Sequence, residues 1–254
     1  MILEKFRLDG KVAVVTGSGT GLGESMAIGL AEAGADIVGV YNTHVPEAAK
    51  SAVEKVGRRF LAVQADLISI EPVPRIIETA VSELCRLDIL VNDAGIIRRA
   101  PSLEYSEKDW DDVMNINLKT LFFLCQAAAR QFVKQKSGGK IINIASMLSF
   151  QGGILIPPYT ASKSGVRGLT QLLANEWARH NINVNAIAPG YMATDNTEPL
   201  RKDPKRGPAI LERIPAGRWG TPEELKGAVV FLASAASNYV NGYTLAVDGG
   251  WLGR

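Results

Sequence analysis

A tyrosine and a lysine placed four residues apart are the side chains of this sequence best suited to proton transfer. Tyr159 and Lys163 follow Pro157 and Pro158, which favour the start of a helix. Residues at this spacing lie on one face of a helix, so the phenol and the ammonium can enter one pocket. An ammonium about 4 Å from a phenolate contributes about 4 kcal/mol at an effective dielectric of about 20. The pair therefore predicts a tyrosine whose pKa is lowered by roughly three units, from about 10 towards about 7, for acid and base catalysis at neutral pH.

A serine at the end of a predicted strand, Ser146, can donate a hydrogen bond to a reacting oxygen. Serine is also a hydrolase nucleophile, but that chemistry needs a histidine within reach. The chain holds only His44 and His180, and it has no G-x-S-x-G turn, so the sequence argues against a serine hydrolase. Taken alone, Tyr-x-x-x-Lys is equally compatible with an ordinary amphipathic pair on a helix.

The segment Thr16 to Gly23, Thr-Gly-Ser-Gly-Thr-Gly-Leu-Gly, joins the first predicted strand to the first predicted helix. Glycine lets the backbone approach a ligand closely, and free N–H groups at a helix start favour a pyrophosphate. The spacing differs from G-x-G-x-x-G, because Leu22 stands where the third glycine would be counted from Gly17. Glycine content by itself also fits a flexible turn.

Short runs rich in Val and Ile alternate with longer segments of helical periodicity, which is typical of repeated β-α-β units. Strands are predicted near residues 12–16, 37–41, 60–64, 89–92, 140–145, 183–188 and 243–247. Helices are predicted near residues 21–33, 47–56, 70–86, 107–136, 158–180 and 221–235. Crossover helices between apolar strands require a mostly parallel sheet that is covered on both faces. The predicted fold is therefore α/β, a Rossmann-like doubly wound sheet of seven parallel strands in a single domain over residues 1–254.

Composition narrows the classes of function. The 254 residues are 46% hydrophobic and 21% charged, which suits one globular domain with a sizeable core. The net charge of +2, without basic runs among aromatics, gives no reason to expect nucleic acid or an anionic membrane as a partner. Cys85 and Cys125 are too few for a disulfide framework, and no apolar run suits a signal peptide or a membrane span. We expect a cytoplasmic protein that acts on a small molecule.

Five motifs in order make the chain resemble the short-chain dehydrogenase/reductase family along nearly its whole length. The glycine loop fits T-G-x-x-x-G-x-G, and Asn92-Asp93-Ala94-Gly95 is similar to the family's N-N-A-G, with Asp93 in place of the second Asn. Asn117, Ser146 and the Tyr159/Lys163 pair complete the series. A catalytically silent nucleotide-binding module commonly loses the tyrosine or the lysine, and both are present here. The resemblance implies an enzyme that moves a hydride between nicotinamide and a secondary alcohol or ketone, without a metal.

The resemblance also implies roles for single residues. Tyr159 would exchange the proton with help from Lys163, and Ser146 would bind the reacting oxygen. Asn117 would hold a water in a proton relay through Lys163. The implied catalytic residues are thus Asn117, Ser146, Tyr159 and Lys163. The implied cofactor-binding residues are Gly17, Gly21, Leu22, Gly23, Asp66, Leu67, Asn92, Ala94, Gly95, Tyr159, Lys163, Pro189, Gly190, Met192 and Thr194.

Within this set, Asp66 would approach the adenine ring, although an Asp there also suits a helix N-cap. The choice of cofactor depends on the end of the second predicted strand, where an acid would bind the ribose hydroxyls of NAD and an Arg would accept the 2′-phosphate of NADP. The sequence there is Tyr41-Asn42-Thr43-His44 and has neither group. A 2′-phosphate would find no guanidinium or ammonium partner, so we expect NAD rather than NADP.

Four further segments resemble a narrower branch of the family that acts on small sugar acids. They are residues 141–153, 185–194, 214–220 and 247–251. A small anionic sugar acid needs a carboxylate partner, and Arg98 or Arg99 could supply a bidentate one. Both arginines also fit a solvated basic loop. With Gln151 as a candidate hydroxyl partner, the expected substrate-binding residues are Ser146, Gln151, Tyr159, Arg98 and Arg99.

The connection over residues 191–220 is longer than usual and holds four prolines. Long connections at the carboxyl end of such a sheet often form a lid, so we expect a substrate lid at about residues 191–220, although a mobile surface insertion fits the same pattern. Family members commonly pair two helices, here about 107–136 and 158–180, across twofold axes, which implies a homotetramer. Gly165 and Gly168 would allow close approach of another backbone, from a second copy or from the same chain.

Overall fold

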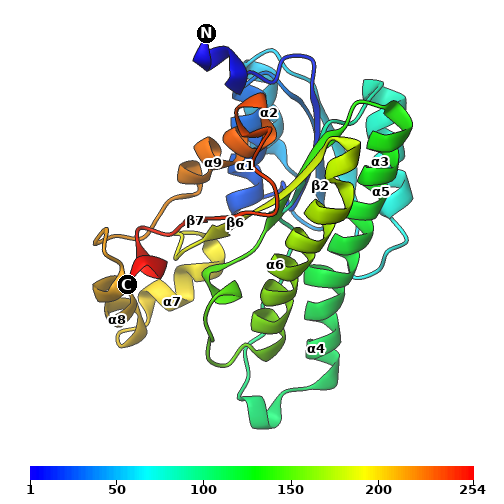
Figure 1. Ribbon diagram of the computed structural model, residues 1–254. Helices are drawn as coiled ribbons and strands as arrows, with labels where there is room; N and C mark the ends of the chain where they lie inside the picture. The colour runs from blue at the N-terminus through cyan, green and yellow to red at the C-terminus, as the bar shows by residue number, and fades with distance from the viewer.

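Seven parallel strands form one sheet at the centre of the protein, whose computed structural model describes residues 1–254 (Figure 1). Their order across the sheet is β3-β2-β1-β4-β5-β6-β7. The strands are β1 (Val12–Thr16), β2 (Asp36–Tyr41), β3 (Phe60–Gln64), β4 (Ile89–Asn92), β5 (Gly139–Ile144), β6 (Ile182–Pro189) and β7 (Thr244–Val247). The predicted fold class and all seven predicted strands are confirmed.

Helices cover both faces of the sheet (Figure 1). On one face lie α1 (Gly21–Glu32), α2 (Glu47–Lys55) and α9 (Lys226–Ala233). On the other lie α3 (Val73–Leu84), α5 (Leu121–Gln135), which follows α4 (Glu107–Met114), and α6 (Pro157–Trp177). Two short helices, α7 (Glu198–Lys202) and α8 (Arg206–Arg213), stand beside the carboxyl terminus.

Alternate residues of each strand enter the two layers. Val12 and Val14 of β1 belong to the core beneath α3, α5 and α6, whereas Ala13 and Val15 belong to the core beneath α1 and α9. Successive side chains of a strand point to opposite faces, so a strand that is apolar at every position must be covered on both. The two cores hold the strands rigidly and fix the positions of the loops at their ends.

The strand order reverses at β1 and β4, which are paired in the sheet with Thr16 opposite Asn92. The chain leaves the carboxyl ends of these two strands in opposite directions. In open α/β sheets such a point leaves a crevice outside the strand ends, and ligands bind there. The fold therefore gathers the segments after β1, β4, β5 and β6 around one crevice.

The helix predicted over residues 107–136 is divided into three. α4 ends at Met114, a π-helical turn, η3, covers Asn115–Thr120, and α5 begins at Leu121. Apolar periodicity continues across such a turn, so the sequence pattern did not reveal it, although π turns are frequent at functional sites. The helix predicted over 221–235 similarly begins with a 3-10 turn, η7 (Pro222–Leu225).

The connection over residues 191–220 contains α7 and α8, which the sequence pattern did not predict because each is too short to show a helical period. Ile210 lies in α8 and Ile214 directly follows it. Both pack with Met147 and Trp251 in a third, small core. Tyr191 joins this cluster through an edge contact with Trp251, with ring centroids 4.9 Å apart. None of the helices has both the length and the apolar content that a bilayer crossing needs.

Candidate active site

A cavity of about 520 Å³ lies at the crevice outside the carboxyl ends of the central strands. This is the usual size of a small-molecule site. The sequence-predicted residues on its wall are Gly17, Gly21, Leu22, Ala94, Gly95, Arg99, Ser146, Tyr159, Lys163, Pro189, Gly190, Met192 and Thr194. The sequence-predicted residues outside its wall are Gly23, Asp66, Leu67, Asn92, Arg98, Asn117 and Gln151.

The glycine loop between β1 and α1 has a conformation that requires its glycines. Gly17 and Gly21 have φ angles of +73° and +63°, in the left-handed region that other residues rarely adopt. A Cβ on Gly23 would overlap the carbonyl oxygen of Gly17, so the first turn of α1 packs directly on the loop. The loop backbone is therefore open to the cavity at the positive end of α1, where an anion is favoured.

Two polar side chains join the ends of the central strands. The Thr16 hydroxyl accepts hydrogen bonds from the backbone N–H groups of Asp93 and Ala94, at 3.1 and 3.0 Å. Asn92 is buried, and its Nδ2 donates to Asn143 Oδ1 of β5 at 3.0 Å. The Asn92 side chain thus links β4 to β5 rather than facing the cavity.

Ser146, Tyr159 and Lys163 meet on the cavity wall. Ser146 follows β5 and caps the short helix η4 (Met147–Ser149), where its hydroxyl accepts from the Leu148 N–H at 3.2 Å. Tyr159 and Lys163 come from the first two turns of α6, which begins at the two prolines as predicted. Lys163 is 4% exposed, and its Nζ lies 5.7 Å from the centroid of the Tyr159 ring.

The predicted lowering of the Tyr159 pKa by Lys163 is wrong for this structure. The Lys163 ammonium lies over the tyrosine ring and donates to the Ile144 carbonyl oxygen at 2.6 Å. Burial raises the pKa of Tyr159 above its usual value, although a hydrogen bond from Ser146 and the charge of Arg99 act in the opposite direction. Burial also lowers the pKa of Lys163. Tyr159 therefore holds its proton at neutral pH. The prediction from residue spacing failed because it left out the desolvation of the phenol.

Asn117 lies in the π-helical turn η3 and is fully buried. Its Oδ1 accepts from the Ile96 N–H at 2.9 Å, and its Nδ2 donates to the Ile96 carbonyl oxygen at 3.0 Å and to Ser162 Oγ at 3.3 Å. The amide fastens the segment after β4 to η3 and α6. The role of Asn117 in a relay through a water stays a prediction.

The two adjacent arginines after β4 have different surroundings. Arg99 lies on the cavity wall and takes part in no ion pair of the structure. Arg98 instead places its Nε 3.6 Å from Asp109 Oδ1 of α4. Neither Arg98 nor Gln151 reaches the cavity wall. Arg98, Arg99 and Gln151 were predicted to bind the substrate and to have no other role. Of these three, the structure places only Arg99 on the cavity wall with Ser146 and Tyr159.

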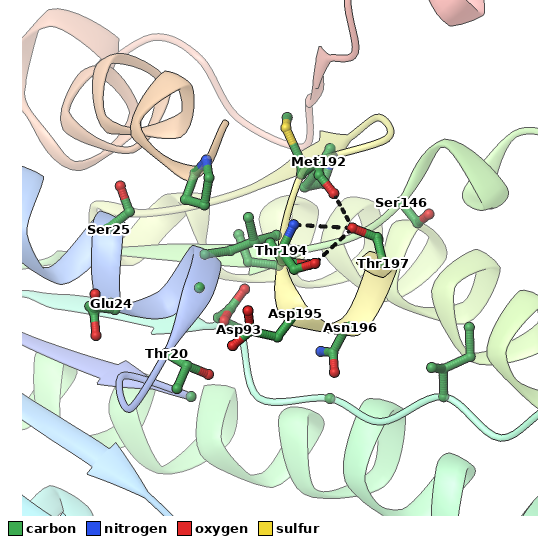
Figure 2. Close-up of a pocket in the computed structure, with 18 of the residues that line it drawn as sticks. Thr20, Glu24, Ser25, Asp93, Ser146, Met192, Thr194, Asp195, Asn196 and Thr197 are labelled. Atoms are coloured by element: carbon green, nitrogen blue, oxygen red, sulfur yellow. Dashed lines mark hydrogen bonds between the residues drawn. The ribbon is translucent and has the colours of Figure 1, made fainter. Parts of the chain in front are cut away.

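The segment after β6 closes one side of the cavity (Figure 2). Met192 and Thr194 line the cavity, together with Asp195, Asn196 and Thr197. The Thr197 hydroxyl lies 2.6 Å from the Met192 carbonyl oxygen and 3.0 Å from that of Thr194, and it accepts from the Thr194 N–H at 3.1 Å. Thr197, which the sequence did not single out, thus sets the shape of this turn.

The ends of β2 and β3 lie outside the cavity wall. Asp66 is exposed, and its carboxylate accepts from the Ile68 N–H at 3.0 Å, whereas Leu67 is buried. Asp66 thus forms a local turn and is not the N-cap of α3, which begins at Val73. After β2, the His44 carbonyl oxygen stands where a Cβ on Gly19 would lie, so this segment packs on the glycine loop.

The wall also includes residues that the sequence did not predict. Thr20 and Glu24 flank the start of α1, and Figure 2 shows them beside the same space as Asp93. Their position beside the glycine loop, at the start of a predicted helix, could have indicated that they line the cofactor cavity. Glu223 and Lys226 come from η7 and α9, and no local pattern connects these distant residues with the glycine loop.

Comparison with known proteins matches nearly the whole chain. The family model described as Enoyl-(Acyl carrier protein) reductase covers residues 17–252. A 2-dehydro-3-deoxy-D-gluconate 5-dehydrogenase of Escherichia coli (strain K12) is 65% identical over 254 residues, with 100% of both chains covered. An enzyme of the same name from Bacillus subtilis (strain 168) is 53% identical, over 99% of this chain and 98% of the relative.

Among solved structures, a gluconate 5-dehydrogenase from Burkholderia cenocepacia J2315 in complex with NADP and tartrate is 42% identical. It superimposes with a TM-score of 0.93 and covers 100% of both chains. The match thus extends over the sheet, the glycine loop and the Tyr159/Lys163 helix alike. The chain belongs to the short-chain dehydrogenase/reductase family, as the order of its motifs predicted.

Proposed function

We propose that this protein interconverts a secondary hydroxyl and a ketone on a small sugar acid, with 2-dehydro-3-deoxy-D-gluconate, oxidised at position 5, as substrate. The names of the relatives from Escherichia coli and Bacillus subtilis support this choice. The observation that carries this proposal is a single cavity beside the glycine loop. Its wall holds Ser146, Tyr159 and Lys163, which can act on a carbinol, and Arg99, which can bind a carboxylate.

Each of these side chains has a defined task in the reaction. Ser146 donates a hydrogen bond to the reacting oxygen and holds it beside Tyr159. Tyr159 takes the hydroxyl proton during oxidation and returns it during reduction. Burial makes the phenolate costly, and the Lys163 ammonium, 5.7 Å from the centroid of the Tyr159 ring, offsets part of that cost. When bound, the nicotinamide takes up the hydride, so that the carbinol loses one hydride and one proton and becomes a ketone.

The glycine loop fits a dinucleotide cofactor. Its backbone is open to the cavity at the start of α1, where free N–H groups suit a pyrophosphate. Pro189, Gly190 and Thr194 line the same cavity as Ser146 and Tyr159. These residues would hold the nicotinamide half.

We propose NAD rather than NADP as this cofactor. The segment after β2 carries His44 but no arginine or lysine. Arg58 and Arg59, just before β3, bind the Gly34 carbonyl oxygen and Asp36 at the amino-terminal end of the sheet. The Burkholderia relative was solved with NADP, so kinetics with both cofactors on this chain test the choice directly. A kcat/KM for NADP equal to or above that for NAD would overturn it.

A panel of sugar acids tests the reaction itself. The purified protein is mixed with NAD and 2-dehydro-3-deoxy-D-gluconate, 2-deoxy-D-gluconate, D-gluconate or a neutral secondary alcohol, and NADH formation is followed by its absorbance. We expect the highest kcat/KM for 2-dehydro-3-deoxy-D-gluconate. Turnover of only the neutral alcohol would assign the chain to another substrate class, and no turnover of any compound would favour a non-catalytic NAD-binding module.

The two adjacent arginines provide a matched pair for the carboxylate assignment. Arg99→Ala removes a cation on the cavity wall, so KM for the sugar acid should rise by about ten- to a hundredfold, the usual worth of a charge-assisted hydrogen bond. Arg98→Ala removes a charge that faces Asp109, and KM should stay within about twofold. A neutral alcohol should show no such difference. Equal effects of both substitutions would remove Arg99 from the substrate site.

Three further properties belong to the same proposal. Residues 191–220 act as a lid that packs on the rest of the protein through the small core of α8 and Trp251.

The protein is a homotetramer, with copies joined through the outer faces of α4, α5 and α6, where Trp110, Val133 and Leu172 are exposed. It works in the cytoplasm, in keeping with two free cysteines. Light scattering after size-exclusion chromatography tests the assembly, and a mass of one or two chains would exclude a tetramer.

A further inference from the structure

Asp93 places a carboxylate where the family pattern has an amide. Its backbone N–H is held by the Thr16 hydroxyl at 3.1 Å, so its position after β4 is fixed. Its Oδ2 lies 2.7 Å from where a Cβ on Gly23 would stand and 3.0 Å from the corresponding point on Gly17. The side chain is therefore packed against the glycine loop on one side and lines the cavity on the other.

Figure 2 shows Asp93 between the start of α1, which carries Thr20 and Glu24, and the turn that carries Asp195. Asp93 takes part in none of the ion pairs of the structure. The charged groups that face the cavity with it, from every element of the wall, are the cations Arg99, Lys163 and Lys226 and the acids Glu24, Asp195 and Glu223.

Lys163 shares the cavity wall with Asp93 and acts on it through its charge, although the two form no ion pair and the Lys163 Nζ donates to the Ile144 carbonyl oxygen. Lys226 is engaged with Glu32 at 2.9 Å, and Arg99 lies on an exposed segment. Burial raises the pKa of the Asp93 carboxyl well above its usual range, and the charge of Lys163 counteracts this rise. In the same way, burial lowers the pKa of Lys163, and the charge of Asp93 counteracts it. Each of the two charges thus stabilises the other.

The effect of Asp93 extends to the reacting phenol. Its negative charge raises the pKa of Tyr159, because a phenolate in the same cavity would be repelled. The Asn of the family pattern would be neutral at every pH and would have neither effect. The carboxylate therefore adds a third ionisable group to a site that the family pattern builds from two.

We propose that Asp93, whose carboxylate is held against the glycine loop on the same cavity wall as Lys163 and Tyr159, is a positioning residue that acts through these two groups. This inference rests on the proposed function, in which Tyr159 exchanges the substrate proton. If the inference holds, the oxidation rate of this enzyme rises at a higher pH than that of a relative with Asn at this position.

Asp93→Asn tests the inference with an almost isosteric change. The pH dependence of kcat/KM is measured for oxidation of 2-dehydro-3-deoxy-D-gluconate by NAD in the wild type and the variant. Without the negative charge, both partner groups lose their protons more readily, so the rising limb should move to lower pH by about half a unit or more. Asp195→Asn is the matched control, since it neutralises another carboxylate on the same wall, and the carboxylate that shifts the pKa of Lys163 and of Tyr159, besides burial, is that of Asp93 rather than that of Asp195. Its rising limb should coincide with that of the wild type.

A rising limb that stays in place or moves to higher pH in Asp93→Asn would overturn the inference, as would an equal shift in Asp195→Asn. Thermal denaturation of each protein checks the fold, and Asp93→Ser supplies a second neutral variant, for which the same shift is expected. A purely structural role for Asp93 would change stability or kcat without moving the midpoint, and that result would also contradict the proposal. Tyr159→Phe separates the two levels: if it retains turnover, the proposed function fails, whereas an inactive Tyr159→Phe with coincident Asp93→Asn and wild-type profiles refutes only the role of Asp93.

Discussion

Replacing Gly23 by alanine tests whether the glycine loop owes its shape to contact with the first turn of α1. A Cβ on Gly23 would overlap the Gly17 carbonyl oxygen and would lie 2.7 Å from both the Gly17 carbonyl carbon and Asp93 Oδ2. Ordinary contacts of a Cβ begin at 3.4 Å, so the Gly17 carbonyl oxygen, which is the nearest atom, would have to retreat by about 1.1 Å. The obstacle is backbone, which cannot rotate aside as a flexible side chain can.

The size of the effect follows from two opposing terms. Forcing a methyl group into a packed site costs about 1–3 kcal/mol, whereas alanine gains up to about 1 kcal/mol over glycine in a helix. We expect the free energy of unfolding to fall by about 1–2 kcal/mol and Tm to fall by about 2–8 °C for a chain of this size. Because the displaced backbone is the part that would face the pyrophosphate, Kd for NADH should rise at least about tenfold.

Thermal denaturation and titration of NADH fluorescence measure the two effects. Gly227→Ala in α9 is the matched control, because Gly227 is exposed and a Cβ there meets nothing within 4 Å. It should leave Kd unchanged and keep or raise Tm. A Gly23→Ala protein with the Tm and the NADH affinity of the wild type would refute the close contact between loop and helix.

Two other substitutions test the surroundings of the cavity. Thr197→Val removes the hydroxyl that holds the turn after β6, so Tm should fall by the equivalent of about 1–2 kcal/mol and KM for NAD should rise. Thr120→Val is the control. It removes a buried hydroxyl that has no hydrogen-bond partner, so it should cost no stability. An equal loss in both would show that the turn does not depend on Thr197. Hydrogen bonds from Arg218 lower the pKa of Glu224 from 4.5 to about 2, so its carboxylate contributes stability above pH 4.5 that is lost as the pH falls towards 2. Urea denaturation at about pH 3 and about pH 6 should show a smaller difference for Glu224→Gln than for the wild type, and an unchanged difference would contradict the pairing.

The sheet could be predicted from the sequence because burial on two faces leaves a simple signature. Strands such as β1 and β4 are buried at every position and apolar at all but the last, and crossover helices allow only a parallel order. The interruption of the long helix at Asn115–Thr120 could not be predicted in this way. A π turn changes the backbone hydrogen bonds while the apolar face continues, so the hydrophobic pattern stays the same.

The site could be predicted wherever it depends on neighbours in sequence. The four-residue spacing of Tyr159 and Lys163 fixes one helix face, and Gly17 and Gly21 need their left-handed backbone for the loop. The direction of a side chain was beyond the sequence, which treated Arg98 and Arg99 alike although only Arg99 faces the cavity.

Energetic balances between distant groups were also beyond the sequence. The estimate for Tyr159 included the lysine charge but not the desolvation of the phenol, which decides the direction of its pKa shift. The asparagines show the same limit, because no sequence pattern indicates that the Asn117 side chain binds Ile96 and Ser162 or that the Asn92 side chain binds Asn143.

The most direct test of proton transfer by Tyr159 is to measure turnover and cofactor affinity on the same preparation of Tyr159→Phe. The phenylalanine ring retains the packing of α6 against the cavity and lacks only the hydroxyl. We expect Kd for NADH to stay within a few fold of the wild type while kcat for the sugar acid falls by about a hundredfold to ten-thousandfold. Turnover close to that of the wild type, with the cofactor still bound, would contradict it.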